Sequence, residues 1–422
     1  MNYSVNKSSF FFYPSVIGAF AGDLINLIPS GAIPGTIFQI GLATGLVGYV
    51  IYSVYSQTAV VKSNTYLFEA LIFLSILAFS VIYSWNPQAG AFYLFRTIVL
   101  FIYAYLFYSS LNSLSDIKKL VNLIVAVSLI IGFYGLIKML SNPGEIAQNI
   151  TSTATGVKNR AVGVENDPNV FASYFLFPVF FLITKYYSSK SLLYKAFYVL
   201  SLLIIMGAVA LTYSRSVWLS IFLGGTLILI IKRDYKIPLI ILVLFLIAAL
   251  SSETLQLLLG TIFNRFYDLL TGNIDTSNQI RIMLFFSSFD MVTSTYGLGV
   301  GNRGFPAYFM KNYDLQDAVG VYESHNMYFQ LLAEQGIIGF LFFMYLFVLI
   351  GFVVWKNYAI SNSQEEKDIN LALIATFIGY ATFYQFYGGA LVDARLYIVG
   401  VIIFSISNIN KTKSNKSRHT LV

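Results

Sequence analysis

Long apolar runs alternate with short polar or basic stretches along the whole chain. A membrane-spanning helix needs about 20 mostly apolar residues. Twelve runs approach that length, at residues 10–28, 36–56, 66–84, 92–112, 117–140, 169–187, 192–213, 216–231, 236–251, 328–355, 369–389 and 392–408. The first is the weakest, because Asp23 and Asn26 interrupt it. The pattern predicts an all-α, polytopic integral membrane protein whose residues 1–422 form a single transmembrane domain, with no secretory signal peptide at its polar start.

The composition supports a membrane protein and excludes several kinds of site. Of the 422 residues, 57% are hydrophobic and 11% are charged, whereas about 25% of the residues in a globular domain are charged. The chain has no Cys and two His. This excludes disulfides, thiolate metal sites and a histidine metal cluster. We therefore expect neither a metal nor a cofactor.

The basic residues predict the orientation, because Lys and Arg collect in cytoplasmic loops. If the N-terminus is inside, 16 of the 26 basic residues fall on the cytoplasmic side. They are Lys7, Lys62, Lys118, Lys119, Lys185, Lys190, Lys195, Lys232, Arg233, Lys236, Lys356, Lys367, Lys411, Lys413, Lys416 and Arg418. We expect both termini to be cytoplasmic and the protein to lie in the inner membrane. This distribution accounts for the net charge of +7 without a nucleic-acid partner.

Arginine is enriched on the predicted outer side. Seven of the nine Arg fall there, whereas 14 of the 17 Lys fall inside. The seven are Arg96, Arg160, Arg215, Arg265, Arg281, Arg303 and Arg395. A guanidinium group presents a planar fork of donors that suits phosphate and carboxylate oxygens. Any single one of these side chains could instead snorkel at the outer interface, but seven together favour an anion site.

One outer connection is long. It runs over residues 252–327, and its segments 253–270 and 278–293 have the apolar spacing of amphipathic helices. A long loop with helices of its own is usually functional. We expect this extracytoplasmic loop to carry part of an active site, with the shorter outer connection 141–169 as a second contributor.

Four stretches resemble one family, the integral-membrane O-antigen ligases and Wzy-type polysaccharide polymerases. Residues 323–339 (ESHNMYFQLLAEQGIIG) carry a His-Asn pair, a helix and a Glu-x-Gly. Residues 280–305 form an Arg-led helix that runs into a Gly-x-Gly turn. Residues 211–220 (LTYSRSVWLS) place Ser-Arg-Ser at a hairpin tip, and residues 159–175 place Pro-Asn at the start of a span.

The resemblance implies a GT-C-like fold with about 12 transmembrane helices and a metal-independent, inverting glycosyltransferase. Such an enzyme transfers glycan from an undecaprenyl-pyrophosphate-linked donor to an acceptor outside the inner membrane. We favour a Wzy-type polymerase, whose acceptor is a lipid-linked repeat. A ligase that uses lipid A core and a protein O-oligosaccharyltransferase remain alternatives. The implied partners are the donor, the acceptor glycan, the bilayer and a chain-length regulator.

His325 is the outer imidazole and the candidate general base. Ser324 is a plausible N-cap for an apolar helix that starts near Asn326. A neutral imidazole can accept a proton from a sugar hydroxyl, and Glu323 is a candidate for orienting it. The alternative is a histidine that serves as a cap or an interfacial hydrogen-bonder.

Arg215 and Arg281 are the candidate ligands of the donor pyrophosphate and complete the predicted catalytic set. Arg215 lies midway along a 40-residue apolar stretch that is too long for one span, so the chain must turn there. Arg303 lies among glycines that would let backbone N–H groups approach an anion. The predicted substrate-binding residues are Arg160, Asn169, Arg303, Asn326 and Tyr322. Asp393 and Arg395 are predicted to form a structural ion pair.

A lipid-glycan flippase or another transporter is the main alternative of a different class. Transport requires ionisable residues or broken helices near the middle of the membrane. Glu69 is nearly the only charge that the sequence places inside the middle spans. The concentration of Arg on one side favours chemistry at the outer surface.

Overall fold

A computed structural model describes residues 7–21, 37–57, 61–62, 66–141, 167–212, 214–233, 276–313 and 323–419. Most of these residues are helical, and no strand occurs within these ranges. The elements are η1 (Lys7–Phe12), α1 (Tyr13–Ala21), α2 (Ile37–Tyr55), α3 (Leu67–Ile82), α4 (Pro87–Ser110), α5 (Leu114–Leu140), α7 (Pro168–Ser173), α8 (Leu176–Ser188), α9 (Leu192–Leu211), α10 (Arg215–Lys232), α13 (Thr276–Ser294), α14 (Phe305–Asn312), α15 (Met327–Ala359), α16 (Gln364–Phe383), η2 (Ala390–Val392) and α17 (Ala394–His419).

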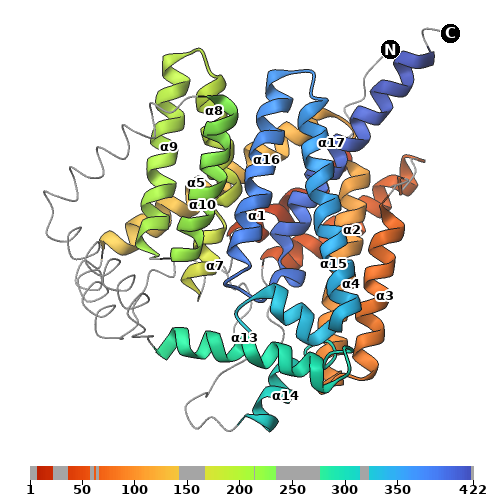
Figure 1. Cartoon of the computed structure of the whole chain (residues 1–422). Helices are drawn as coiled ribbons and strands as arrows, with labels where there is room; N and C mark the ends of the chain where they lie inside the picture. The colour runs from red at the N-terminus through yellow and green to blue at the C-terminus, as the bar shows by residue number, and fades with distance from the viewer. Residues whose placement is uncertain are drawn as a thin grey trace, which may run out of the picture.

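Most of the long helices run roughly side by side, and α13 lies across one end of them (Figure 1). We call this end of the bundle the α13 end. The start of α15 and the short helices α7 and α14 also lie there, whereas both chain termini lie at the opposite end. The α8–α9 and α15–α16 connections are at that opposite end too. The molecule therefore has two chemically distinct ends separated by the length of its helices.

Seven helices in the described ranges are long and apolar enough to cross a membrane. They are Phe38–Tyr55, Pro87–Ser110, Leu114–Lys138, Pro168–Ser188, Leu192–Leu211, Arg215–Lys232 and Met327–Ala359. A helix covers much of every predicted span except 236–251, which lies outside the described residues together with 253–270. The all-α membrane fold is confirmed, and the count of twelve spans stays a prediction.

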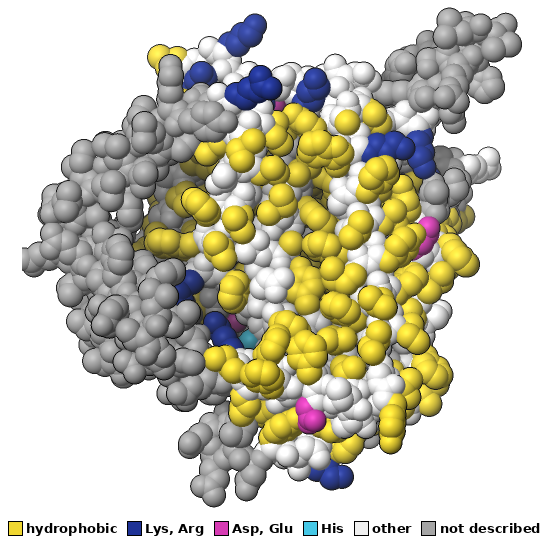
Figure 2. Space-filling view, viewed as in Figure 1, with side chains coloured by type: hydrophobic (Ala, Val, Ile, Leu, Met, Phe, Trp, Pro, Cys, Tyr) yellow, Lys and Arg dark blue, Asp and Glu magenta, His cyan; other side chains and the backbone are white. Residues whose placement is uncertain are grey.

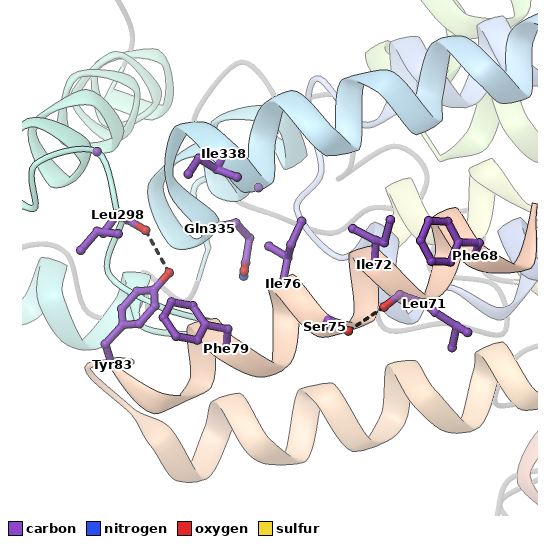
Figure 3. A pocket seen from close by; sticks show the side chains of 12 residues that line it. Phe68, Leu71, Ile72, Ser75, Ile76, Phe79, Tyr83, Leu298, Gln335 and Ile338 are labelled. Atoms are coloured by element: carbon purple, nitrogen blue, oxygen red, sulfur yellow. Dashed lines mark hydrogen bonds between the residues drawn. The ribbon is translucent and has the colours of Figure 1, made fainter.

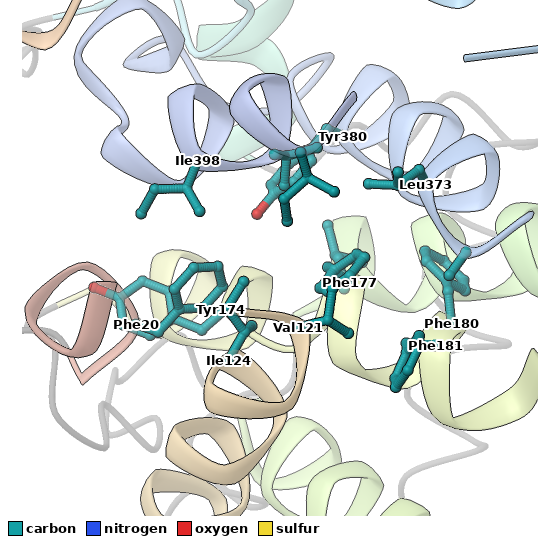
Figure 4. Packing of buried hydrophobic residues seen from close by; sticks show 14 of the residues in the cluster. Phe20, Val121, Ile124, Tyr174, Phe177, Phe180, Phe181, Leu373, Tyr380 and Ile398 are labelled. Atoms are coloured by element: carbon teal, nitrogen blue, oxygen red, sulfur yellow. The ribbon is translucent and has the colours of Figure 1, made fainter. Parts of the chain in front are cut away.

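The interior is built around α8, in which eight of the 13 residues are buried. Phe180 is fully buried between α10 and α16, where Gly224 and Gly379 leave room for its ring. A Cβ at Gly224 would lie 2.4 Å from the Phe180 ring. Small residues permit this close approach of membrane helices. Phe177 and Phe181 extend the same cluster toward α5 and α16 (Figure 4).

The outer surface of the helices is strongly apolar. Large side chains such as Leu192, Val54 and Ile82 are exposed. Apolar side chains cover the middle of the molecule, while Lys and Arg gather near the end that holds the termini (Figure 2). A soluble protein would rarely expose so extensive an apolar patch, so this surface suits contact with lipid.

Three basic residues at the end that holds the termini pair with carboxylates of α16. Lys232 and Lys185 lie 3.2 and 3.9 Å from the carboxylate of Asp368, whose side chain is 1% exposed. Lys118 forms a second ion pair with Glu365. These contacts attach α5, α8 and α10 to the start of α16.

Candidate functional site

The predicted turn after α9 is confirmed at the α13 end. The helix ends at Leu211, and α10 begins at Arg215. The Ser214 hydroxyl donates to Asn169 Oδ1 at 2.8 Å, while the carboxylate of Asp167 caps α7 by accepting from the Asn169 N–H at 2.7 Å. The Ser-Arg-Ser tip and the Pro-Asn motif are thus held together, and the Arg215 side chain is exposed beside them.

Arg395 anchors the start of α17 to α7. Its Nε donates to Asp393 Oδ1 at 2.7 Å, and its Nη1 donates to Ser173 Oγ at 2.8 Å and to the Val170 carbonyl at 3.2 Å. The guanidinium also lies 4.2 Å from the centre of the Tyr174 ring. The predicted ion pair is confirmed, and it holds α7 in place.

The helix predicted at 278–293 is present as α13, but its apolar side chains are not segregated on one face, so its predicted amphipathic character is not confirmed. Its Phe285 and Phe289 rings pack against Phe329 of α15, with ring centres 4.6 and 5.8 Å apart. Phe286 remains 65% exposed. One edge of α13 therefore packs on the helix that follows His325, and Arg281 lies near the N-terminal end of this packed helix.

The turn at residues 297–301 hydrogen-bonds to a break in α15, and we call this contact the clasp. Gly336 has a φ of +66°, which interrupts the helix and frees two carbonyl groups before it. The N–H groups of Val300 and Gly301 donate to these carbonyls, on Ala333 and Glu334, at 2.8 and 2.9 Å. These two N–H groups therefore satisfy the broken helix, and contact between this turn and a substrate anion stays a prediction.

The start of α15 also differs from expectation. Asn326, rather than Ser324, is the N-cap, and its Oδ1 accepts from the N–H groups of Tyr328 and Phe329 at 3.0 and 3.1 Å. The Asn326 amide donates to Gln385 at 3.2 Å. His325 precedes this cap with a φ of +54°, and its side chain is exposed. The left-handed residue lets the chain reverse direction just before the helix begins.

Five residues around this reversal form a closed circuit, which we call the polar ring. Arg303 Nη1 donates to Glu323 Oε1 at 2.8 Å, and the Arg303 N–H donates to Glu334 Oε2 at 3.0 Å. Gln330 Nε2 donates to Glu334 Oε1 at 3.1 Å, and the Ser324 N–H donates to Gln330 Oε1 at 3.4 Å. The peptide bond between Glu323 and Ser324 closes the ring.

The guanidinium of Arg303 stays charged inside the polar ring. Burial alone would lower the pKa of Arg303, but the hydrogen bond to Glu323 and the charges of Glu334 and Glu323 raise that pKa above its ordinary value. The same group lies 5.1 Å from the centre of the Tyr93 ring of α4, within the range of a cation–π contact. Arg303 thus joins the loop after α13 to α4 and to the start of α15.

A lipid-facing groove of about 470 Å³ lies between α3 and the part of α15 around its break. It follows α3 from Phe68 to Tyr83, and the turn at Leu298 lies beside its Tyr83 end (Figure 3). Gln335 of α15 points toward α3 there, and its buried amide has no hydrogen-bond partner among the described residues. The groove is therefore apolar along its length, with one unsatisfied amide next to Glu334.

The structure brings several predicted site residues to the α13 end and leaves others untested. Asn169 contacts the Ser-Arg-Ser tip, and Arg303 contacts Glu323. Arg160 and Tyr322 lie outside the described residues. The side chains of Arg303 and Asn326 hydrogen-bond within the protein, so their contact with substrate stays a prediction.

Sequence reasoning missed Gln330 and Glu334. Both side chains are buried, at 5% and 3% exposure. The expectation that Glu69 is nearly the only charge inside the middle spans is wrong, because Glu334 lies in α15 as well. A usable signal was present: two polar residues at i and i+4 interrupt an otherwise apolar run and share one helix face.

Comparison with known proteins supports the family resemblance. Residues 199–344 match the family model described as O-Antigen ligase, and this range includes three of the four motifs. The chain is also 24% identical over 220 residues to the teichuronic acid biosynthesis protein TuaE of Bacillus subtilis (strain 168). That alignment covers 50% of this chain and 44% of TuaE, so the chain spans less than half the length of this relative.

The resemblance to the O-antigen ligase and polymerase family is therefore confirmed. Members of this family are glycosyltransferase-like membrane enzymes of polysaccharide biosynthesis, and they act on lipid-linked glycans.

Proposed function

We propose that this chain is a Wzy-type polymerase with a GT-C-like fold. It transfers glycan from an undecaprenyl-pyrophosphate-linked donor to a lipid-linked acceptor at the outer face of the inner membrane. The family match supports glycan transfer, and the name of the Bacillus relative refers to the synthesis of a polysaccharide. A ligase acting on lipid A core and a protein O-oligosaccharyltransferase are alternatives that differ only in the acceptor.

The observation that carries the proposal is the position of His325. The imidazole is exposed immediately before α15, at the same end of the bundle as the first residue of α10 and as α13. The two residues after it are held to the segment that follows α16, since Met327 donates its N–H to the Tyr384 carbonyl at 2.9 Å and Asn326 donates to Gln385. An exposed imidazole at the same end of the bundle as exposed Arg215 suits a proton transfer near a bound anion.

In the proposed reaction an acceptor hydroxyl attacks the anomeric carbon of the donor in line with the leaving group. A new C–O glycosidic bond forms, the bond from that carbon to the pyrophosphate oxygen breaks, and the configuration inverts. His325 takes the hydroxyl proton, and undecaprenyl pyrophosphate leaves with the bonding electrons. Arg215 and Arg281 stabilise its charge, a task that their planar donor forks suit without a metal. Asn169, Arg160 and Tyr322 contact the glycan.

We further propose that the groove along α3 receives the hydrocarbon chain of the lipid carrier. It is lined by apolar side chains, and its Leu298 end reaches the break in α15. Ser75 lines this groove, whereas Ala78 of the same helix is exposed outside it. Ser75→Trp should raise the KM for the lipid-linked donor several-fold, while Ala78→Trp should leave it unchanged. Equal KM values for the two variants would show that the groove does not bind the lipid-linked donor.

The test of function is glycan transfer by the full-length chain in proteoliposomes with undecaprenyl-pyrophosphate-linked oligosaccharide. His325→Gln still forms hydrogen bonds but takes up the proton far less readily, so transfer should fall by about 10²–10⁴. His419→Gln, which alters the other histidine of the chain, is the matched control and should retain activity. Close to wild-type transfer by His325→Gln would show that another group acts as base.

The products of the same assay identify the acceptor. A ladder of longer lipid-linked chains made from donor alone indicates a polymerase. Transfer that appears only after lipid A core or a hydroxyl-bearing peptide is added indicates a ligase or a protein oligosaccharyltransferase. Movement of the intact donor across the bilayer without transfer would favour a flippase, for which the half-buried Glu69 of α3 and the buried Glu334 of α15 are the relevant residues.

The orientation is proposed from the two ends of the bundle. Lys190, in the α8–α9 connection, lies at the end that holds the termini, and Asn312 ends α14 at the α13 end. Reporter fusions at these residues should therefore report opposite sides, with Lys190 cytoplasmic. Two reporters on the same side would overturn both the orientation and the outer location of the site.

A further inference from the structure

We propose that the polar ring is a positioning device for His325, and that Glu323, Arg303, Glu334 and Gln330 act on catalysis only through it. This inference rests on the proposed function for the role of His325 as the base. It assigns Arg303 a role inside the protein instead of contact with the substrate.

His325 needs support from its surroundings because of its backbone. Its φ of +54° lies in the left-handed region, which residues other than glycine seldom adopt and which persists where neighbouring structure enforces it. On its C-terminal side, the cap formed by Asn326 fixes the chain. On its N-terminal side, the polar ring holds both the Ser324 N–H and the Glu323 carboxylate.

The geometry favours an internal role for Arg303. Its guanidinium contacts Glu323 on one side and faces the Tyr93 ring on another, and its own N–H donates to Glu334. The Arg303 and Glu323 side chains are each 24% exposed, so the pair is half-enclosed. Arg303 also adopts a left-handed φ of +57°, two residues after the Gly301 N–H that bonds to the break in α15, so its backbone is held as well as its side chain.

Glu334 links the Arg303 and Gln330 members of the ring. A carboxylate buried in a lipid-facing helix is costly unless it is paired or hydrogen-bonded. Both of its oxygens accept hydrogen bonds, one from the Arg303 backbone and one from Gln330. Gly388 closes the opposite side, since a Cβ there would lie 2.5 Å from Gln330 Oε1 and 2.6 Å from Glu323 Oε2. The segment after α16 thus packs directly on the ring.

The decisive variants are Arg303→Met, Glu323→Gln and their combination, assayed in proteoliposomes. If Arg303 acts through Glu323, each single variant should lower kcat at least ten-fold and leave the donor KM within two-fold. The double variant should be no worse than either single one, because both remove the same contact. If Arg303 instead binds the donor, Arg303→Met should raise the donor KM, and Glu323→Gln should not lower kcat. That result would overturn the proposal.

A second readout follows the imidazole itself and does not depend on transfer. In a His419→Gln background His325 is the only histidine, so its rate of modification by diethyl pyrocarbonate can be measured alone. Glu323→Gln should change this rate at least three-fold. Glu365→Gln, which breaks the ion pair with Lys118 at the other end of the bundle, should not change it. An unchanged rate in Glu323→Gln would overturn the positioning role.

These two readouts separate the inference from the proposed function. If the wild-type chain transfers no glycan but Glu323→Gln alters the reactivity of His325, the function is wrong and the ring still positions the imidazole. Gln330→Leu tests the other side of the ring, because it removes the hydrogen bond to Glu334 while leaving that carboxylate bound to the Arg303 N–H. Gln330→Leu should lower kcat and change the modification rate, and wild-type values for both would count against the ring.

Discussion

Two arginine–carboxylate pairs lie at the α13 end, and they differ in how completely their surroundings enclose them. The guanidinium of Arg395 has partners on all its nitrogens, and the side chains of Arg395 and Asp393 are 5% and 7% exposed. Within the described part of the chain, the Arg303 side chain makes one hydrogen bond, to Glu323, and both partners are 24% exposed. The first pair is closed and the second is open.

The surroundings of the two pairs explain the difference. The Asp393–Arg395 pair joins three segments, because Arg395 also binds the Val170 carbonyl and Tyr384 donates its hydroxyl to Asp393 at 2.7 Å. It therefore holds helices together. The open pair lies next to His325, whose backbone must be rigid while its side chain stays accessible. A saturated ion pair therefore indicates a structural role, whereas a half-open one next to an exposed imidazole indicates an active site.

The largest expected effect comes from breaking the closed pair. Arg395→Met leaves Asp393 buried without its charge partner, which costs about 3–5 kcal/mol of folding free energy. The open pair is more exposed, so Arg303→Met should cost about 1 kcal/mol or less. We expect Arg395→Met to be lost from the membrane fraction or to aggregate in size-exclusion chromatography, while Arg303→Met remains monodisperse.

The double variant Asp393→Leu with Arg395→Met is the control for this prediction, because it removes both charges together. It should recover a substantial part of the lost yield. Equal loss of protein for Arg395→Met and Arg303→Met would show that the distinction between a closed and an open pair has no energetic basis.

Much of the fold could be predicted because membrane helices are specified locally. The apolar stretch that is too long for one span required a turn, and it occurs between Leu211 and Arg215. The pairing of Asp393 with Arg395 was predictable for the same reason, since the two residues are near neighbours in the sequence.

The polar ring could not be predicted, because its members meet only through tertiary contacts. Arg303 and Glu334 are 31 residues apart and approach each other where Gly336 breaks α15. The predicted N-cap of α15 was wrong for a related reason. Ser324 and Asn326 are both favoured capping residues, and the sequence does not show the left-handed backbone of His325 between them, where the chain reverses just before α15.

A smaller effect is expected from the glycine that breaks α15. A Cβ at Gly336 would lie 2.2 Å from the Gly297 carbonyl oxygen, and the residue needs a φ of +66°. Gly336→Ala should therefore cost about 1–3 kcal/mol, lowering the melting temperature in detergent and displacing the clasp under the open pair. Gly225→Ala is the matched control, since nothing lies within 4 Å of a Cβ there. In mid-helix it should be neutral or gain up to about 1 kcal/mol. Equal melting temperatures for the two variants would show that the clasp tolerates a side chain.

The smallest expected effect concerns Asn326, which caps α15 close to the open pair. Asn326→Ala removes the acceptor for two N–H groups and should cost about 0.5–2 kcal/mol, with a fall in glycan transfer because the cap follows His325 directly. Asn326→Asp keeps the capping oxygen and should retain most of the stability and transfer.

Ser363→Ala supplies the matched control for that variant, because Ser363 caps α16 at the opposite end by accepting from the Glu366 N–H. It should lose a similar amount of stability without loss of transfer. The predicted alternative role of Asn326, contact with the acceptor sugar through its amide, gives a different pattern. In that case Asn326→Asp would keep the wild-type melting temperature but transfer as poorly as Asn326→Ala, since an aspartate cannot donate the amide hydrogen bond.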